Sequence, residues 1–463
     1  MPQEVDMLSG VYPTDGDGET TAVLLNWSRL DNLKVIVKHL CQYSMFKEIM
    51  IWNNNGEVHL SDQLRYYNSP ENMYFIARYI ACAMATTPYC YFQDDDWIIR
   101  QVRSMYANFL RFPNLVHIDT DANVYSLTNW KWCFFDDSID LHSCFSWVGT
   151  GAFATRENVI KFLKIASVAE MDPIEFSFGD MYFTTFMNQV PYQLENELQE
   201  LPRGNAFSAD DERIRNKLYM HKALLRLCDH LSRKTGAFET GELYPNIYQR
   251  DVRSPCANDR CLFLTNKRTF PDVRVFRYRP SVNISESERI HEDYYNTDHF
   301  IKHPYSHAVD GKDWTAWKSQ EAIRKDDYIG LDLLFPTPLP LTFKLVIDHH
   351  RDYFSSLEIH ISFDGIDWIP LVPLPKISIR QLPQTGLDGK THLLLCSFQI
   401  RETGIRFVRL TSTDEWEFPY GVYDFSFHAS TELNDEGFQR MLHLEVPRLS
   451  TIEGKKIGEC GQL

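Results

Sequence analysis

The sequence has 463 residues and a mass of 54.3 kDa, which is more chain than one ordinary hydrophobic core holds, so we expect two or three domains. Hydrophobic residues make up 44% and charged residues 24%, which is typical of a globular protein. The 47 basic and 63 acidic residues give a net charge of −16, which argues against nucleic acid as the main partner. No apolar run reaches the ~18 residues of a membrane-spanning helix.

The N-terminus and the cysteines both bear on the cellular compartment. The first twenty residues are acidic and lack the apolar core of a signal peptide, so we expect a cytoplasmic protein, or one of the ER or Golgi lumen if an anchor is missing from this sequence. Ten cysteines include no CxxC pair, which disfavours a zinc site and predicts reduced, packed thiols. Cys256 and Cys261 flank a short loop, and a disulfide between them is the alternative to two reduced thiols.

The composition changes along the chain and suggests five parts. Residues 20–245 alternate strand-like and helix-like patterns, which predicts an α/β domain. Residues 291–435 carry short β-rich runs separated by turn residues, which predicts an all-β sandwich. Residues 246–290 are expected to be a linker or docking segment, 1–19 a disordered or extended N-terminus, and 436–463 a tail.

The first hundred residues predict a βαβ unit followed by a second helix and a third strand. The expected elements are a strand over Thr21–Asn26, a helix over Ser28–Tyr43, a strand over Glu48–Trp52, a helix over Asn72–Thr86 and a strand over Tyr89–Gln93. Ligands of open α/β sheets bind at the carboxyl ends of the strands. Polar residues that follow these strands are therefore candidate site residues.

Three consecutive aspartates, Asp94, Asp95 and Asp96, follow the third predicted strand. Carboxylates so close raise one another's pKa or require a cation, and hard oxygen ligands favour Mg²⁺ or Mn²⁺. If the strand geometry continues, Asp94 and Asp96 point to one side and Asp95 to the other. An acidic surface turn is the alternative, which the preceding apolar strand disfavours.

These stretches together resemble a GT-A nucleotide-sugar glycosyltransferase, with glycosyltransferase family 64, the catalytic domain of exostosins, as the nearest family. The resemblance rests on the ordered set TTAVLLNWSRLDNLKVIVKHL, EIMIWNNNG and YFQDDDW, followed by Val148–Phe153 and Phe178–Asn188. It implies a Rossmann-like, nucleotide-sugar-binding fold. It also implies metal-dependent transfer of a sugar, expected from a UDP-sugar, to a glycan or glycoconjugate acceptor with retention of configuration.

The resemblance assigns roles to individual residues. Asp94 and Asp96 would hold Mn²⁺ (or Mg²⁺) against the donor diphosphate, and Asp180 and Arg78 would be catalytic. Asp180 would face the anomeric centre or the acceptor hydroxyl, although an N-cap aspartate is the alternative. Arg78 would reach the donor, although Ala77 replaces the family's asparagine beside it and a helix-surface cation is the alternative.

The remaining assignments concern the donor, the acceptor and an additional metal ligand. The nucleotide-sugar-binding set is Asn26, Arg29, Asn53, Asn54, Arg78, Asp94 and Asp95. For the asparagines, turn formation is the alternative. Thr150, Gly151 and Ala152 would line the acceptor side, where small residues let a sugar approach the backbone. His221 would be an additional metal ligand, although a solvated helix face with an isolated histidine is the alternative.

The C-terminal half resembles the discoidin, or coagulation factor 5/8 type C, module, which implies a jelly-roll β-sandwich. The resemblance rests on Ala308–Trp317, Leu341–Ile347, Leu357–Trp368, Gly404–Leu410 and Val422–Phe427. Trp317 and Trp368 are expected in the core. Such modules contact glycans or lipid surfaces through loop tips, and the insert at 373–390 is expected to form such a tip or to be disordered.

The sequence therefore predicts a hexosyltransferase joined to a sugar- or lipid-contacting module. Two alternatives stay open: a non-catalytic carbohydrate-binding protein with a degenerate GT-A domain, and an inverting family 2-type glycosyltransferase. The donor sugar, the acceptor and the oligomeric state do not follow from the sequence.

Overall fold

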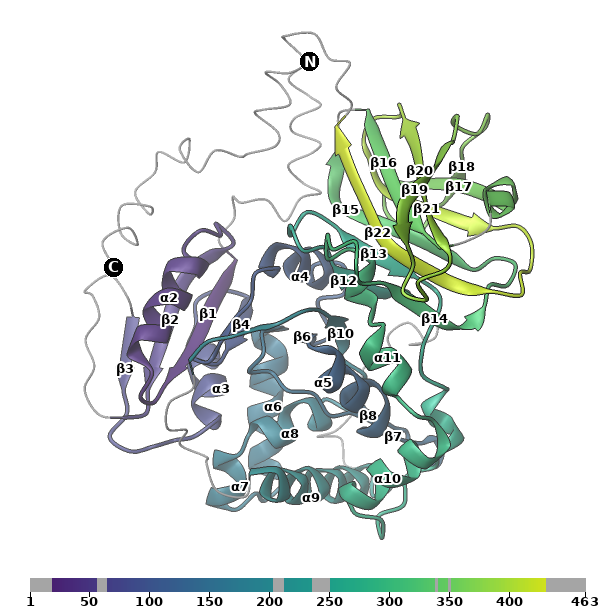
Figure 1. Ribbon diagram of the computed structural model, residues 1–463. Coiled ribbons are helices and arrows are strands. Elements are labelled where there is room, and N and C mark those ends of the chain that lie inside the picture. The colour runs from purple at the N-terminus through teal and green to yellow at the C-terminus, as the bar shows by residue number, and fades with distance from the viewer. Residues whose placement is uncertain are drawn as a thin grey trace.

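The computed structural model describes residues 19–55, 65–202, 212–234, 250–337, 340–348 and 351–429. The chain consists of a mixed α/β half followed by a half built from two antiparallel sheets (Figure 1). This division confirms the predicted combination of an α/β part and an all-β part. None of the helices in these ranges is long and apolar enough to cross a membrane.

A seven-stranded sheet forms the centre of the α/β half, in the order β10-β6-β9-β4-β1-β2-β3. Its strands are β1 (Thr20–Asn26), β2 (Phe46–Asn53), β3 (Arg65–Asn68), β4 (Tyr89–Gln93), β6 (His117–Thr120), β9 (Ala152–Thr155) and β10 (Tyr192–Glu195). Only β9 runs antiparallel to its neighbours. The register pairs Asn26 with Asn53 and Leu24 with Gln93, so the carboxyl ends of β1, β2 and β4 meet at one edge.

Helices cover both faces of this sheet because alternate strand residues point to opposite sides. Val23 packs with α3, α6, α8 and α9, whereas Leu24 packs with α2 and α4. The bounds are α2 (Leu30–Leu40), α3 (Ile76–Ala83), α4 (Val102–Phe109), α5 (Ala122–Ser126), α6 (Arg156–Val168), α7 (Pro173–Ser177), α8 (Asp180–Phe186) and α9 (Glu212–Ser232). A π-helical turn, η1 (Leu127–Lys131), continues α5, and 3₁₀ turn η2 (Asp137–Ile139) joins β7 (Cys133–Asp136) to β8 (Leu141–Cys144). The short strands β5 (Trp97–Ile98) and β11 (Gln199–Glu200) pair with each other.

The C-terminal half consists of a six-stranded sheet, β12-β13-β15-β21-β17-β18, and a five-stranded sheet, β14-β22-β16-β20-β19. Its strands are β12 (Val252–Pro255), β13 (Leu262–Thr265), β14 (Trp317–Ala322), β15 (Tyr328–Thr337), β16 (Leu341–Ile347), β17 (Leu357–Ser362), β18 (Ile369–Pro370), β19 (Ser378–Thr385), β20 (His392–Ile400), β21 (Ile405–Ser412) and β22 (Pro419–Ala429). Its helices and 3₁₀ turns are η5 (Val273–Val275), α10 (Ile284–Tyr294), α11 (Asp298–Lys302), η6 (Tyr305–Ala308) and η7 (Arg351–Ser356). The two sheets share an apolar core in which Trp317 is fully buried, whereas Trp368 is half-buried beneath Arg409.

Two segments expected to be irregular contain regular structure. The described part of the 246–290 segment contributes β12 and β13 to the six-stranded sheet and begins α10, whereas 246–249 lie outside the described residues. The 373–390 insert contains β19, the outer strand of the five-stranded sheet. The terminal parts 1–18 and 430–463 also lie outside the described residues.

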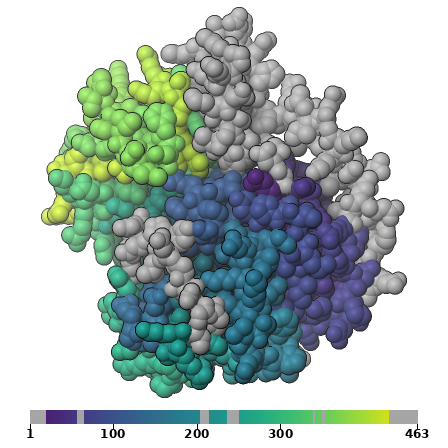
Figure 2. All heavy atoms as spheres, turned by 180° about the vertical axis from the view of Figure 1, so that it is seen from behind, coloured from purple at the N-terminus to yellow at the C-terminus, as the bar shows by residue number. Residues whose placement is uncertain are grey.

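The two halves share an apolar core. Leu264 and Phe407 of the sandwich lie in the same buried cluster as Val102 and Phe109 of α4. The contact is also polar: Asp259, in the turn between β12 and β13, accepts backbone N–H groups of α4 from Ser104 at 2.7 Å and from Arg103 at 3.0 Å. Seen from behind, the green-to-yellow C-terminal half lies directly against the blue region that contains α4 (Figure 2).

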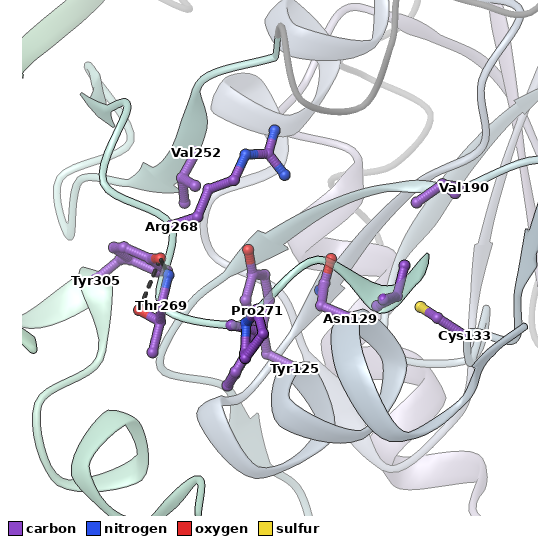
Figure 3. Close-up of a pocket in the computed structure, with 11 residues that line it drawn as sticks. Tyr125, Asn129, Cys133, Val190, Val252, Arg268, Thr269, Pro271 and Tyr305 are labelled. Atoms are coloured by element: carbon purple, nitrogen blue, oxygen red, sulfur yellow. Dashed lines mark hydrogen bonds between the residues drawn. The ribbon is translucent and has the colours of Figure 1, made fainter. Parts of the chain in front are cut away.

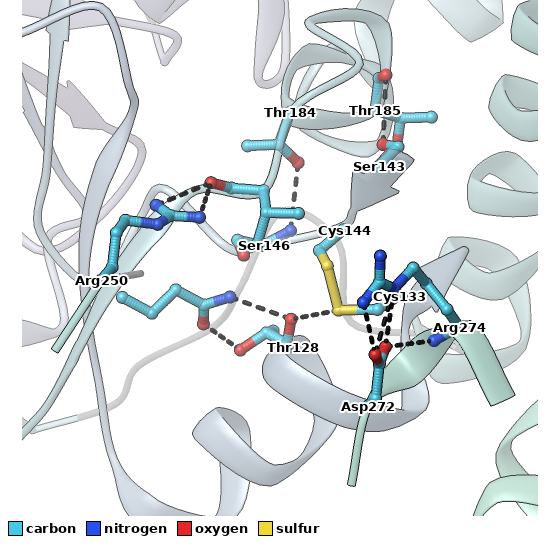
Figure 4. Close-up of a disulfide and its surroundings, with 12 residues drawn as sticks. Thr128, Cys133, Ser143, Cys144, Ser146, Thr184, Thr185, Arg250, Asp272 and Arg274 are labelled. Atoms are coloured by element: carbon cyan, nitrogen blue, oxygen red, sulfur yellow. Dashed lines mark hydrogen bonds and ion pairs between the residues drawn. A yellow bond between two sulfur atoms is a disulfide. The ribbon is translucent and has the colours of Figure 1, made fainter. Parts of the chain in front are cut away.

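Three disulfides between described residues correct the expectation of reduced thiols. They join Cys82 to Cys90, Cys133 to Cys144 and Cys256 to Cys261. Cys133 and Cys144 are directly opposed residues of β7 and β8 (Figure 4). Cys228 and Cys396 are free and buried. Only Cys256 and Cys261, which flank a short loop, could be suspected as a pair from the sequence, because the other two pairs depend on which elements become neighbours in the fold.

Candidate functional site

Buried amides mark the edge where β1 and β2 end. Asn26 Nδ2 donates to Asn53 Oδ1 at 2.9 Å, and Asn53 Nδ2 donates to Asn68 Oδ1 at 3.1 Å. Asn54 Oδ1 accepts the backbone N–H of Met73 at 3.1 Å, which fixes the approach to α3. These asparagines therefore build the strand-end turns, and Asn26 Oδ1 is the amide oxygen without a hydrogen bond to any described residue.

The aspartate triplet forms a turn, and this corrects the expected alternation of its side chains. Asp95 and Asp96 lie in a turn after β4, so both reach the same guanidinium. Arg29 Nη1 lies 2.7 Å from Asp95 Oδ1 and 3.2 Å from Asp96 Oδ2. Asp94 faces a different cation, with its Oδ1 2.6 Å from Arg78 Nη2. Asp94 and Asp96 are the more exposed members, at 33% and 19% of their side-chain surface against 10% for Asp95.

A glycine provides the space for the Asp94 carboxylate. The backbone N–H of Asp94 donates to the carbonyl of Gly149 at 2.8 Å, so these two segments of the chain are in direct contact. A Cβ on Gly149 would lie 2.0 Å from Asp94 Oδ2 and 2.5 Å from its Cγ. Any other residue at this position would displace the carboxylate.

Arg78 is buried between two carboxylates. It lies on α3 with no exposed surface, which excludes the alternative of a helix-surface cation. Its Nε is 3.2 Å from Asp180 Oδ1, which also accepts the Tyr79 hydroxyl at 2.8 Å. Gly179 holds the N-cap position of α8 and Asp180 is its first residue, so Asp180 does not cap the helix as the alternative supposed. Asp94, Arg78, Asp180 and Tyr79 thus form one polar chain.

Burial sets the electrostatics of this chain. It raises the pKa of Asp180 to about 6, against the opposing effect of Arg78. Burial also raises the pKa of Asp95, although Arg29 opposes it. For Arg78, burial alone would lower the pKa, but Asp180 and Asp94 outweigh it and raise the pKa above its usual value. The guanidinium therefore stays charged at any physiological pH.

The site carries more negative than positive charge. When all groups are ionised, Asp94, Asp95, Asp96 and Asp180 contribute four negative charges and Arg29 and Arg78 contribute two positive ones, so 2 − 4 = −2. One divalent cation would neutralise this remainder. Carboxylate oxygens are ligands that Mn²⁺ and Mg²⁺ accept, and these ions commonly use one or two carboxylates and complete their shell with substrate phosphates. The residues therefore fit such an ion.

The expected acceptor-side residues are buried. Thr150 Oγ1 donates to the carbonyl of Asp119 at 2.7 Å, and the carbonyl of Gly151 accepts the N–H of Asp119 at 3.0 Å. Ala152 begins β9 and has no exposed surface. Gly151 has φ of +99°, a conformation that favours glycine. This stretch anchors Gly149, and through it Asp94, to the end of β6.

His221 lies on α9, half-buried, and burial lowers its pKa. Among the described residues, no group of three or more histidine, cysteine, aspartate or glutamate side chains is arranged to hold a metal ion. The structure thus does not unite His221 with Asp94 and Asp96 in a protein-only metal site.

Sequence reasoning missed three contributors: Tyr79, Gly149 and Asn32. Asn32 Nδ2 donates to the carbonyls of Asp95 and Pro202, both at 2.9 Å, and holds the acidic turn from the side. Tyr79 follows Arg78 directly, and Gly149 directly precedes the predicted acceptor stretch, but neither residue type signals such a role by itself.

Comparisons with known proteins find only weak likenesses. Neither a protein family nor a curated protein matches the sequence. Glucosyl-3-phosphoglycerate synthase from Mycobacterium tuberculosis, in complex with phosphoglyceric acid, is similar over 49% of this chain and 84% of its own, at 9% identity and a TM-score of 0.28. Chitosan-binding module 2 of a chitosanase/glucanase from Paenibacillus sp. IK-5, in complex with chitotriose, covers 28% of this chain and 88% of its own, at 17% identity and a TM-score of 0.20. Chitosan-binding module 1 of the same enzyme covers 27% of this chain and 83% of its own, at 21% identity and a TM-score of 0.18. Likenesses at these TM-scores assign neither a family nor an activity.

Proposed function

We propose that the α/β half is a metal-dependent glycosyltransferase that moves a sugar from a nucleotide-sugar, with UDP as the expected nucleotide, to a glycan or glycoconjugate, with retention of configuration. The observation that carries the proposal is the excess charge of −2 at the carboxyl edge of a mainly parallel sheet, where Asp94 and Asp96 are the more exposed carboxylates of the acidic turn. Phosphate-bearing ligands of open α/β sheets bind at this kind of edge. The ordered sequence resemblance to GT-A enzymes supports the same assignment.

Asp94 and Asp96 would hold Mn²⁺ or Mg²⁺ together with the donor diphosphate, and the ion would stabilise the negative charge of the departing nucleotide. Arg29 is the cation that must share Asp96 with the ion, and its second carboxylate partner, Asp95, keeps it in place. If Asp96 turns to the ion, Arg29 loses its contact with Asp96 and keeps its contact with Asp95.

Arg78 and Asp180 act in this proposal as positioning residues. Both side chains are buried, at 0% and 2% exposed, so neither presents surface to a donor in this conformation. Arg78 fixes the direction of the Asp94 carboxylate, and Asp180 together with Tyr79 fixes Arg78. The role expected for Asp180 at the anomeric centre would require α8 or the acidic turn to move.

For the rest of the chain, we propose that the β-sandwich contacts the glycan or a lipid surface and that the protein matures in an oxidising compartment. Stable disulfides form in secreted, ER and periplasmic proteins and are rare in the cytosol, and three are present here. This favours the lumenal location over the cytoplasmic one.

A thermal-shift panel tests the donor site. UDP, GDP and their sugar conjugates are added with and without Mn²⁺, and a ligand at ~100 times its Kd stabilises the folded state by about 2.7 kcal/mol. We expect one nucleotide to raise the Tm only with Mn²⁺, and Asp96→Asn to abolish the shift. Asp31→Asn, an exposed aspartate on α2, is the matched control and should keep it.

Three outcomes decide the proposal. No shift with any nucleotide would contradict it and favour a degenerate, carbohydrate-binding domain. A shift without turnover of the UDP-sugar, even to hydrolysis, would favour a binder. With turnover, the anomeric configuration of the product, assigned by NMR, separates a retaining enzyme from an inverting one.

A further inference from the structure

A pocket lies where the two halves meet, away from the acidic turn. Its wall combines α5 and η1 of the α/β half with the 268–273 segment and Tyr305 of the C-terminal half (Figure 3). Its interior volume is about 50 Å³, which holds a few water molecules or a small oxyanion. A second hollow shares Arg268, Thr269, Phe270 and Pro271 with it, so the 268–271 segment has open space on two sides.

Two polar groups line this pocket without a hydrogen bond to any residue that the structure describes. The amide nitrogen of Asn129 is buried without a partner among the described residues. The Tyr125 hydroxyl also has no hydrogen bond to a described residue, and its oxygen is accessible to water although the residue as a whole is only 6% exposed. Buried polar groups in folded proteins are nearly always satisfied, so the buried Asn129 amide beside a pocket indicates a water or a ligand that accepts its hydrogen bond.

The backbone that carries Asn129 is also unusual. Residues Leu127–Lys131 form a π-helical turn directly after α5, and such turns are rare and frequently occur at functional sites. The turn is held by Gln193, whose Nε2 donates to the carbonyl of Thr128 at 2.9 Å. This hydrogen bond holds the turn and thereby fixes the position of Asn129.

The chemistry of the wall favours a negatively charged ligand. The residues that line the pocket include Arg268 and no aspartate or glutamate. Behind the wall, the guanidinium of Arg250 donates from Nη1 and Nη2 to the carbonyl of Val190, both at 3.2 Å, and makes no ion pair with a described residue. In a protein with a net charge of −16, a donor-rich wall without carboxylates is a local positive region.

We propose that this pocket binds a small oxyanion, either free or carried on a sugar as a carboxylate, sulfate or phosphate, through Asn129, Tyr125 and Arg268. The Asn129 amide and the Tyr125 hydroxyl donate to the anion oxygens, and Arg268 and Arg250 supply the positive charge. The site is independent of the proposed donor site, because it needs neither a nucleotide nor a metal ion.

Isothermal titration of the full chain with sodium glucuronate, glucose, phosphate and sulfate, without nucleotide or Mn²⁺, tests this proposal. Glucuronate and glucose share a ring and differ in the carboxylate, so we expect heat from glucuronate and none from glucose. Binding of glucuronate alone identifies a sugar acid, and binding of phosphate or sulfate identifies a free-anion site. Absence of binding by all three anions overturns the proposal.

Two variants and one control locate the binding. Asn129→Asp replaces the donor by a carboxylate and should weaken anion binding by about tenfold or more. Tyr125→Phe removes a hydroxyl that makes no hydrogen bond to a described residue, so it should keep the Tm of the free protein and still lower the affinity. Asn123→Asp makes the same charge change at an exposed position of α5 and should bind as the parent does. Unchanged affinity in both Asn129→Asp and Tyr125→Phe would place the anion elsewhere and overturn the assignment.

Discussion

Arg78 Nη2 donates to Asp94 Oδ1 at 2.6 Å, from a position on α3 that has no exposed surface. The most exposed carboxylate of the acidic turn is thereby oriented by a fully buried cation. Because Asp180 holds the other side of the same guanidinium, the direction of Asp94 is set by the packing of α3 and α8.

Replacing Arg78 by methionine should destabilise the fold strongly. Removal of one partner of a buried ion pair typically costs about 3–5 kcal/mol, because the remaining charge is left without compensation. Urea denaturation of Arg78→Met, Asp180→Asn and the double variant measures the effect, and the double variant should lose less than the sum of the two. Arg233→Met, an exposed residue directly after α9 that pairs with Asp229, should change the free energy of unfolding by no more than about 0.5 kcal/mol. Equal losses in Arg78→Met and Arg233→Met would contradict the buried network.

Gly149→Ala should disturb Asp94 without removing its charge. The new Cβ would lie 2.0 Å from Asp94 Oδ2, so the carboxylate must turn away from its present position. We expect the Mn²⁺-dependent thermal shift with nucleotide to fall as far as in Asp94→Asn, and the double variant to lose nothing further. An unaltered shift in Gly149→Ala would mean that the position of Asp94 is irrelevant to binding.

Glu195 should make the stability of the contact between the halves pH-dependent. Its carboxylate accepts the N–H of Ser306 at 2.7 Å and the hydroxyl at 2.9 Å, and burial raises its pKa from 4.5 to about 8. Between these values the folded chain holds a proton that the unfolded chain has lost, so the free energy of unfolding falls as the pH rises through this window. Glu195→Gln mimics the protonated form. It should match the parent near pH 5 and exceed its stability at pH 8 to 9.

Chemical denaturation across pH 5 to 9 checks this expectation. Glu157→Gln, at an exposed position of α6, serves as the control and should follow the parent throughout. If Glu195→Gln keeps the parent's slope with pH, the buried carboxylate is not the group that titrates.

Asp259 should couple the two halves during unfolding. It accepts the N–H groups of Arg103 and Ser104 and so completes the N-terminus of α4 from the other half of the chain. Asp259→Ala should cost about 1 kcal/mol, the usual loss for a helix cap, and Asp293→Ala, an exposed residue of α10, much less. Calorimetry of the parent should show one transition, because Leu264 and Phe407 share a core with α4. Two well-separated transitions would show that the halves fold independently.

Thiol mapping tests the disulfides. Alkylation of the denatured, unreduced protein should modify Cys228 and Cys396, whereas Cys82, Cys90, Cys133, Cys144, Cys256 and Cys261 should react only after reduction. Peptide mass spectrometry identifies the modified residues. Labelling of these six cysteines before reduction would contradict the three disulfides and favour the reduced thiols expected from the sequence.

The sequence predicted the elements whose pattern is local. The strand expected over Tyr89–Gln93 is β4 with the same bounds, and the run Leu341–Ile347 is β16. Helix ends were less accurate: α3 begins at Ile76 and not at Asn72, because Tyr74 adopts φ of +52° and interrupts the helix.

Within the candidate site, the sequence predicted which residue types are present better than it predicted where their side chains point. Three aspartates after a buried strand could be recognised, but their side-chain directions could not, because the strand ends at Gln93 and the next residues turn. The role of Gly149 depends on β9 passing beside β4, and the Arg78–Asp180 pair depends on α8 packing near α3. Such contacts join distant parts of the chain, and a single sequence carries no local signal for them.

The disulfide between Cys82 and Cys90 has a consequence for the order in which the site is assembled. It joins α3 to β4 across eight residues, with Arg78 one helical turn before it and Asp94 four residues after it. One short stretch of chain, residues 76–94, therefore contains both partners of the ion pair and the covalent bond between the elements that carry them. During synthesis this stretch emerges long before α8 or the sandwich exists. The approach of Arg78 to Asp94 is therefore held within this stretch by a covalent bond that needs neither α8 nor the sandwich.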